Sequence, residues 1–267
     1  MQLQLQNSKI NSSTDLTITG SKSESNRLLL LKALFSSLEV QNISNSDDSQ
    51  YMLKALSTES NTVDIHHAGT AMRFLTAYFA ILEGSTILLT GSQRMQERPI
   101  KILVDALRDL GADIEYASQE GYPPLRITGK RLFKDEVRMK ANVSSQYISA
   151  LVLMATKLEN GLKLHLEGKI TSVPYINMTL SLLEQIGVET SFEGQTINVN
   201  PYLETDLKTL TVESDWSSAS YFYSIIALSP PGTQVRLSTY KKDSLQGDAV
   251  LKDIYKKMGV ETTFEGS

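Results

Sequence analysis

The chain has 267 residues, of which 41% are hydrophobic and 21% are charged, and its formal net charge is −4. This composition is typical of a globular protein and argues against a general nucleic-acid-binding protein, whose surface is usually basic. The sequence contains no cysteine, which excludes disulfides, thiolate metal ligands and a cysteine nucleophile. The first residues lack the basic segment and apolar run of a signal peptide, and no apolar stretch approaches the roughly 18 residues of a membrane span, so we expect a cytoplasmic protein without a membrane partner.

Residues 1–6 alternate polar and apolar side chains, which predicts a β-strand. We expect the next element, a helix, to begin near Gly20 and to continue through the leucines at 28–31. Its first turns carry Lys22 and Arg27 together with three serines, where free backbone N–H groups and the helix dipole favour a negative charge. This helix start is therefore a candidate site for a phosphate or carboxylate group.

Later segments repeat this design. Small or hydroxyl residues open predicted helices at 69–70, 144–146 and 217–219, and the last two starts follow their predecessors by 74 and 73 residues. Predicted helix ends recur at Gly111, Gly187 and Gly259, which are 76 and 72 residues apart, and each is followed by a segment of alternating polarity. We therefore predict a unit of strand, helix, strand, helix, strand, strand, about 70 residues long, in an α/β fold with internal pseudo-symmetry.

The copies differ in completeness. Two copies end in a predicted hairpin. One hairpin pairs residues 114–116 with residues 125–128, and the other pairs the strand that ends at residue 192 with the strand at 196–199. A weaker first copy has its helix end at 51–57 and a strand at 62–65. In the last copy, a strand at 260–264 reaches a turn and the chain ends at Ser267, before a returning strand. Because this would leave an unpaired strand edge, we expect the chain to be the front part of a longer protein.

Three further segments place polar side chains near a predicted helix start. Arg94 and Arg98 precede Pro99, which we expect at the first position of a helix. Residues 144–146 offer two hydroxyls and an amide, and residues 172–175 combine a serine, a proline and a tyrosine. Each segment also has an ordinary structural interpretation, as a balanced surface pair, a helix cap or a turn with a buried tyrosine.

Seven ordered motifs of this chain resemble the 5-enolpyruvylshikimate-3-phosphate synthase family. They are residues 20–27, 68–73, 94–99, 144–146, 172–175, 215–220 and 246–248, and the resemblance covers essentially the whole chain. It implies an α/β fold of two lobes, each built of three βαβαββ units as an inside-out α/β barrel. It places residues 21–210 in one complete lobe of three units, on the shikimate 3-phosphate side, and residues 1–20 and 211–267 in an incomplete second lobe.

The resemblance also implies a reaction. The family transfers the enolpyruvyl group of phosphoenolpyruvate to the 5-hydroxyl of shikimate 3-phosphate and releases phosphate, in the shikimate pathway of aromatic amino acid biosynthesis. We expect no metal and no cofactor, and a monomer that binds these two small-molecule substrates and no nucleic acid. By motif, Lys22 is the catalytic residue that assists proton transfer. The implied contacts to shikimate 3-phosphate are Lys22, Ser23, Arg27, Ser144, Ser145, Gln146, Ser172 and Tyr175. The implied contacts to phosphoenolpyruvate are Lys22, His67, Gly69, Arg98 and Gln146.

Two departures from the family pattern stand out. His67 occupies a position where the family usually has asparagine, and a histidine there can donate a hydrogen bond but changes its charge near neutral pH. His66 and His67 have no ligand partner at metal-binding spacing, so we predict no metal site. The catalytic aspartate of the family would lie beyond Ser267, so we expect this chain alone to bind shikimate 3-phosphate weakly and to turn over negligibly.

Two alternatives remain open at this point. One is the related enolpyruvyl transferase that acts on UDP-N-acetylglucosamine, which is disfavoured because that family typically carries a reactive cysteine and a Lys-Asn pair where this chain has Lys22 and Ser23. The other is a non-catalytic lobe that binds a sugar phosphate.

Overall fold

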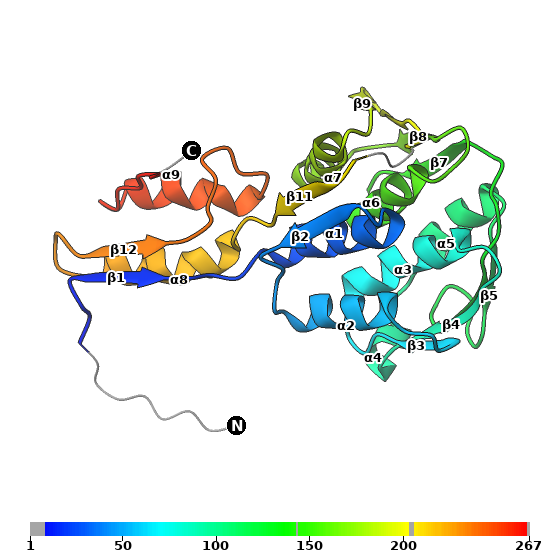
Figure 1. Cartoon of the computed structure of the whole chain (residues 1–267), viewed down its shortest axis with the longest axis horizontal. Coiled ribbons are helices and arrows are strands. Elements are labelled where there is room, and N and C mark those ends of the chain that lie inside the picture. The colour runs from blue at the N-terminus through cyan, green and yellow to red at the C-terminus, as the bar shows by residue number, and fades with distance from the viewer. Residues whose placement is uncertain (1–8, 143, 203–205, 266–267) are drawn as a thin grey trace.

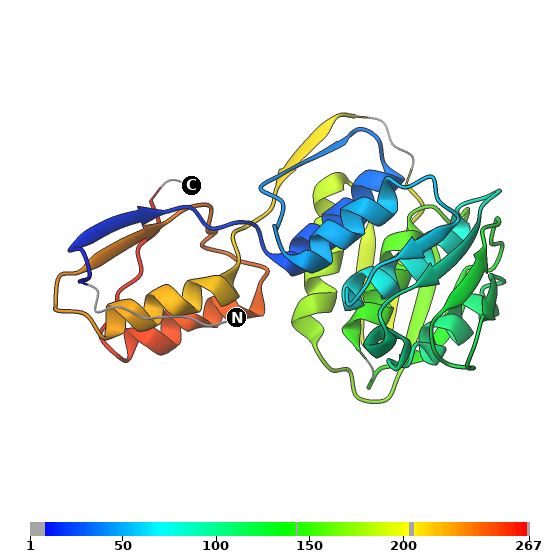
Figure 2. The same cartoon turned by 90° about the horizontal axis from the view of Figure 1, so that it is seen from below.

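The computed structural model describes residues 9–142, 144–202 and 206–265, and the strand predicted at 1–6 lies outside them. The chain forms two lobes of unequal size, joined by two crossing segments (Figures 1 and 2). One crossing segment follows β1 (Ser13–Leu16) and the other follows β11 (Lys208–Thr211). In the described part of the chain, no helix is long and apolar enough to cross a membrane.

Two copies of the predicted unit are complete in the large lobe. The first consists of β3 (Thr62–Asp64), α3 (Gly69–Ile81), β4 (Thr86–Thr90), α5 (Lys101–Asp109), β5 (Asp113–Tyr116) and β6 (Leu125–Thr128), with a short helix α4 (Gln93–Gln96) before α5. The second consists of β7 (Glu136–Lys140), α6 (Ser145–Ala155), β8 (Leu162–Glu167), α7 (Val173–Ile186), β9 (Thr190–Glu193) and β10 (Thr196–Val199). Their sheets have the equivalent orders β3-β4-β6-β5 and β7-β8-β10-β9, each with one parallel and two antiparallel pairings. The predicted βαβαββ unit is therefore present twice in chain order.

The first copy is built differently. It contains α1 (Lys22–Leu34), β2 (Leu38–Gln41) and α2 (Asp47–Leu56), and no hairpin lies between α2 and β3. The strand predicted to close this copy is β3, which instead pairs in parallel with β4 and opens the next unit. The parallel partner of β2 is β11, which returns late in the chain and sets Thr211 opposite Gln41. The expectation of three units in chain order is thus wrong for the first copy, because alternating polarity predicts a strand but not its partner.

Burial explains why helices form the interior of the large lobe. The leucines at 28–31 in α1 are all buried, and residues 24–31 as a whole leave no solvated face in the middle of this helix. Most residues of α3 and α6 are also buried, whereas α5 buries one apolar stripe that includes Leu103 and Leu107. These three helices, α1, α3 and α6, are buried on most sides and pack inside while the sheets lie around them, as an inside-out α/β barrel requires (Figure 2).

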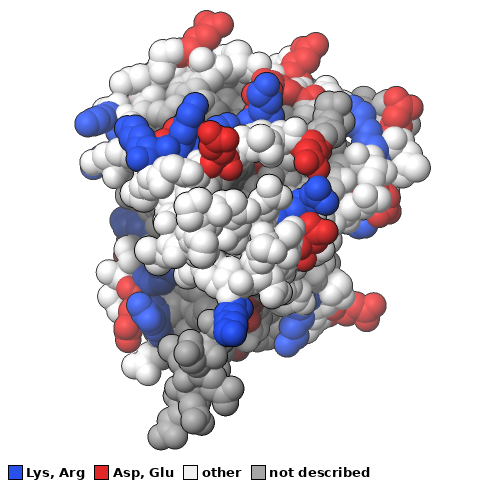
Figure 3. All heavy atoms as spheres, turned by 90° about the vertical axis from the view of Figure 1, so that its left-hand side faces the viewer, with Lys and Arg blue, Asp and Glu red and all other residues white. Residues whose placement is uncertain are grey.

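The small lobe contains β1, α8 (Trp216–Ala227), β12 (Gln234–Leu237), the 3-10 helix η1 (Gly247–Val250) and α9 (Leu251–Lys256). Its β1 and β12 pair in parallel, and its small core centres on Trp216 and Tyr223. Several large apolar side chains of α8 and α9 are exposed, among them Tyr221 and Ile254. Seen from this end, the molecule shows uncharged residues in the middle with charged residues mostly around them (Figure 3).

Two local predictions differ from the structure. Residues 260–265 form no strand, although Gly259 has the predicted positive φ of 86°. A strand needs a partner for its ladder, and among the described residues β12 pairs only with β1. Pro99 does not begin a helix, because α5 starts at Lys101 after the N-cap residue Ile100.

Candidate active site

The amino ends of four helices meet in the large lobe. The side chain of Gln146, at the start of α6, donates a hydrogen bond from Nε2 to Thr70 Oγ1 at the start of α3, over 3.2 Å. The guanidinium of Arg27 in α1 donates to the carbonyl oxygens of Ser23 (2.7 Å) and of Tyr175 in the first turn of α7 (3.3 Å). These contacts bring together helix starts that are far apart in the sequence.

A cavity of about 360 Å³ opens at this meeting point. All five residues predicted to contact phosphoenolpyruvate line it, namely Lys22, His67, Gly69, Arg98 and Gln146. Four lining residues were not predicted: Ser46, Asp47, Asp48 and Thr70. The sequence did carry a helix-start signal at Ser46, Asp47 and Asp48, because Ser46 is the N-cap residue of α2 and accepts a hydrogen bond from the Ser49 amide. The common location makes a joint role of the five predicted residues geometrically possible.

Positive charge is concentrated at the start of α3. Its N-cap residue, Ala68, provides no side-chain cap, so the first N–H groups of the helix lack a capping side chain. The Arg98 guanidinium lies against this helix start: a Cβ atom at Gly69 would come within 2.3 Å of Arg98 Nη1, so a larger residue there would force the guanidinium to move. A cation beside the positive end of a helix is unfavourable unless an anion joins them. The arrangement therefore favours an anionic ligand.

The acidic side chains of the cavity are held by other groups. Asp48 Oδ1 accepts a hydrogen bond from Asn26 Nδ2 over 2.6 Å, and Asp47 Oδ2 lies 3.5 Å from His67 Nε2. In the described part of the chain, no ion pair joins Lys22 or Arg98 to a carboxylate. Both cations thus remain available to a negatively charged ligand.

Arg73 adds a fixed positive charge behind the cavity. It is 5% exposed, donates from Nη1 to the Gly69 carbonyl (2.9 Å) and lies over the ring of Tyr147. Burial lowers the pKa of this guanidinium, and the nearby charge of Arg98 lowers it further. Its Nε atom is buried without a hydrogen-bond partner in the described structure, and no described carboxylate forms an ion pair with it. A buried cation without a counter-ion raises the positive potential of the neighbouring cavity.

His67 is engaged within the protein. Its Nδ1 atom lies 2.6 Å from Nδ1 of His66, whose ring stacks on Tyr51, and its Nε2 atom faces Asp47. A hydrogen bond between two Nδ1 atoms needs one with a proton and one without, so the two imidazoles cannot both be fully protonated in this arrangement. A ligand in the cavity would therefore compete with Asp47 for a hydrogen bond from His67 Nε2.

Arg27, an implied contact to shikimate 3-phosphate, does not line the cavity. Its side chain is 2% exposed and also donates to the hydroxyls of Thr179 (2.7 Å) and Ser149 (3.0 Å). Burial lowers its pKa to about 10. The reason for the difference is position, because Arg27 lies more than one turn into α1 and faces α6 and α7. Ser145 is likewise buried and does not line the cavity, whereas Lys22 and Arg98 do.

The remaining residues predicted to contact shikimate 3-phosphate lie at the same helix starts but outside the cavity. Ser144 is the exposed N-cap residue of α6, and its hydroxyl accepts a hydrogen bond from the backbone N–H of Gln146 over 3.3 Å. Ser172 precedes α7 with a positive φ of 57°, and Tyr175 in the first turn is 42% exposed. Ser23 is half-buried. Arg27 donates hydrogen bonds to the backbone carbonyl oxygens of two of these four residues, Ser23 and Tyr175.

Comparison with known proteins identifies the family. A profile described as EPSP synthase (3-phosphoshikimate 1-carboxyvinyltransferase) matches residues 56–267. The chain belongs to the EPSP synthase family. It is 48% identical over 251 residues to 3-phosphoshikimate 1-carboxyvinyltransferase of Bacteroides fragilis, and 38% identical over 277 residues to the protein of that name from Sulfurovum sp.. These matches cover 93% and 92% of this chain.

Solved structures support the fold. An EPSP synthase from Acinetobacter baumannii matches with a TM-score of 0.73 and 21% identity over 92% of this chain. This member of the EPSP synthase family spans 60% of the length of the Bacteroides relative, 64% of the Sulfurovum relative and 59% of the Acinetobacter chain. Among its described residues, no group of three His, Cys, Asp or Glu side chains is placed to hold a metal ion.

Proposed function

We propose that the protein transfers the enolpyruvyl group of phosphoenolpyruvate to the 5-hydroxyl of shikimate 3-phosphate and releases phosphate, as a step of aromatic amino acid biosynthesis. The observation that carries this proposal is the cavity lined by Lys22 and Arg98, which form no ion pair with a carboxylate among the described residues, beside the start of α3, which has no side-chain cap. Family membership and the names of the relatives support it.

The cavity suits phosphoenolpyruvate because that substrate is small and carries several negative charges. Arg98 and the first N–H groups of α3 would hold its phosphate or carboxylate, and Gln146 would orient it through its amide. The two substrates are both anionic and repel each other, so the cations of this site would lower the cost of bringing them together. The charge of Arg73 would add to this attraction without contact.

Lys22 is the proposed catalytic residue. The 5-hydroxyl would lose its proton as its oxygen adds to C2 of phosphoenolpyruvate, while C3 of phosphoenolpyruvate gains a proton, which gives a tetrahedral intermediate. Loss of a proton from the new methyl group and departure of phosphate would then restore the double bond. Lys22 begins α1, is exposed and lines the cavity, so its ammonium group can assist these proton transfers and stabilise the developing charge.

Shikimate 3-phosphate would bind beside the cavity, across the starts of α1, α6 and α7. Ser144, Ser145 and Ser172 would hold its 3-phosphate region, and Tyr175 and Ser23 would line the ring site. In the arrangement described, Arg27 would act on this site through the carbonyl oxygens of Ser23 and Tyr175. That the protein is a cytoplasmic monomer remains a prediction.

Calorimetry on the 267-residue chain tests the proposal. Shikimate 3-phosphate should bind, and phosphoenolpyruvate should increase its affinity. Lys22→Met should weaken binding at least tenfold, whereas Lys32→Met, in the same helix but in an exposed ion pair with Glu39, should not. Absence of binding, or preferential binding of UDP-N-acetylglucosamine, would contradict the proposal. Measuring phosphate release with both substrates would separately test turnover by this chain.

A further inference from the structure

The joint between the lobes is a short paired ribbon. Gly20 and Ser214 form an antiparallel bridge, and Asp215 N donates to the Thr19 carbonyl over 3.1 Å. The amide of Ser21 donates to the Glu213 carbonyl over 2.8 Å. Both crossing segments are thus held together at the point where α1 and α8 begin.

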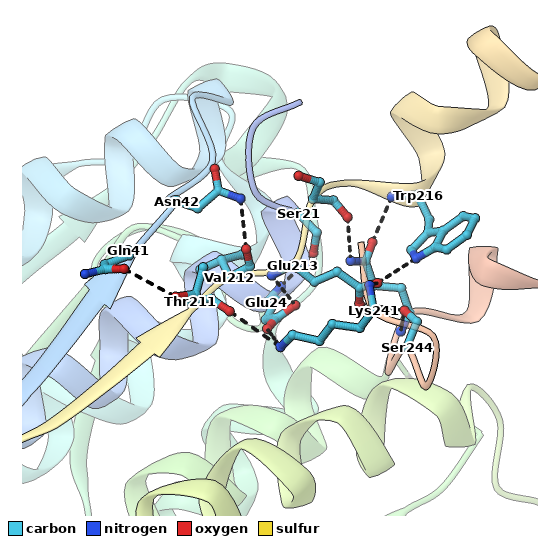
Figure 4. A network of polar contacts seen from close by, with 12 residues as sticks. Ser21, Glu24, Gln41, Asn42, Thr211, Val212, Glu213, Trp216, Lys241 and Ser244 are labelled. Atoms are coloured by element: carbon cyan, nitrogen blue, oxygen red, sulfur yellow. Dashed lines mark hydrogen bonds and ion pairs between the residues drawn. The ribbon is translucent and has the colours of Figure 1, made fainter. Parts of the chain in front are cut away.

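Two carboxyl groups are buried at this joint (Figure 4). Glu24 lies in the first turn of α1 and Glu213 lies in the crossing segment after β11, and each is 1% exposed. Glu213 is well supplied with donors: Oε1 accepts from Trp216 Nε1 (2.7 Å) and from the Lys241 amide (3.0 Å), and Oε2 accepts from Ser244 Oγ (2.6 Å). Both oxygens of the Glu213 carboxylate are therefore held by hydrogen bonds.

Glu24 has much weaker support. Its Oε2 accepts one hydrogen bond, from the Glu213 amide, over 3.3 Å. Its Oε1 lies 3.8 Å from Nζ of Lys241, whose side chain is 44% exposed and reaches across from the small lobe. The loop that carries Lys241 also packs Leu245 against the core of the large lobe. The contact between Glu24 and Lys241 therefore links α1 to the small lobe at a distance that still allows closer approach.

We infer that Glu24 and Lys241 form a proton-dependent latch between the lobes. When Glu24 is ionised, it attracts Lys241 and draws the loop at 238–246 towards the start of α1. When Glu24 is protonated, it no longer attracts Lys241 and no longer repels Glu213. The small lobe then moves away from the start of α1. The latch concerns the joint and does not depend on the reaction proposed above.

The surroundings of Glu24 agree with a change of protonation near neutral pH. Burial raises its pKa to about 7; the charge of Lys241 opposes this rise, Glu213 adds to it, and Arg27 in the same helix opposes it weakly. An arrangement with Lys241 closer would lower the pKa of Glu24, so higher pH favours that arrangement.

The fluorescence of Trp216 reports on this joint, because it is the only tryptophan and its indole donates to Glu213. A titration of the whole chain from pH 5 to 9 should show a transition with a midpoint near 7. Glu24→Gln should abolish the transition, and Lys241→Met should move its midpoint to higher pH. Glu39→Gln, which changes an exposed carboxylate paired with Lys32, is the matched control and should leave it unchanged. A transition that persists in Glu24→Gln would overturn the inference.

A distance measurement then tests movement of the lobes. The chain has no cysteine, so spin labels can be attached at Lys54→Cys in α2 and Lys256→Cys in α9, both exposed positions. The distance between the labels should shift between pH 6 and pH 8, and this shift should be absent when Glu24→Gln or Lys241→Met is added. An unchanged distance in the parent chain would contradict the latch even if the fluorescence titrates, and so would a shift that survives Glu24→Gln.

Discussion

Replacing Arg27 with alanine should weaken folding more than ligand binding. The sequence alone suggests that Arg27 contacts shikimate 3-phosphate directly, so that the loss would be about 2–5 kcal/mol of binding free energy. In the structure, four N–H groups of this buried guanidinium are bonded within the protein: to Thr179, Ser149, and the carbonyls of Ser23 and Tyr175. The side chain therefore ties α1 to α6 and α7.

The expected loss of unfolding free energy in Arg27→Ala is the balance of two opposing contributions. A hydrogen bond to a charged group contributes about 1.5–3 kcal/mol, so four of them amount to about 6–12 kcal/mol. Removing a buried guanidinium that has no described ion-pair partner returns several kcal/mol of desolvation cost. The hydroxyls of Ser149 and Thr179 also remain bonded to each other over 2.8 Å. We expect a net loss of about 3–5 kcal/mol in the free energy of unfolding.

Urea unfolding followed by circular dichroism at a helix wavelength measures this loss. Arg108→Ala is the matched control, because Arg108 lies over the ring of Tyr116 as Arg27 lies over that of Phe74, and it donates to the backbone carbonyl of Ile114, away from the site. The control should change the unfolding free energy by less than about 1 kcal/mol. The reasoning would be refuted if Arg27→Ala left the unfolding free energy unchanged while abolishing binding of shikimate 3-phosphate, since the guanidinium would then be a ligand group.

Three other variants test the cavity and the joint. Gly69→Ala should displace the Arg98 guanidinium, since the added Cβ would lie 2.3 Å from Nη1, and calorimetry should show phosphoenolpyruvate binding reduced about tenfold or more. Arg73→Met removes a buried cation without a described carboxylate partner, so the unfolding free energy should stay the same or rise by about 1 kcal/mol. The same variant should weaken phosphate binding. A loss of about 3 kcal/mol in unfolding free energy would contradict this reasoning. Glu24 binds its proton more tightly in the folded state, with a pKa raised from 4.5 to about 7. Its contribution to stability is therefore full below pH 4.5 and is lost as the pH rises to about 7, a fall of at most about 3 kcal/mol. Urea unfolding at pH 5 and pH 8 should show that the unfolding free energy falls less with rising pH in Glu24→Gln than in the parent chain, because the variant lacks this titrating carboxyl group.

Local rules predicted the features that depend on neighbours in the sequence. The starts of α1 and α6 follow from their capping serines, and the positive φ of Gly187 follows from the left-handed conformation that glycine adopts at a helix end. The recurrence of these signals at nearly constant spacing predicted the repeated unit. Resemblance to a family then grouped five residues that the structure places around one cavity.

Contacts between distant segments were decided only by the tertiary structure. The pairing of β2 with β11, the burial of Arg27 among α6 and α7, and the bond between Glu24 and the amide of Glu213 each join residues far apart in the chain. The spacing of apolar residues in the sequence identifies a strand or a buried helix face, but it does not identify the strand's partner. Nor does it identify which donors and acceptors a charged side chain will contact. Those choices depend on packing and desolvation, which exist only once the lobes have assembled.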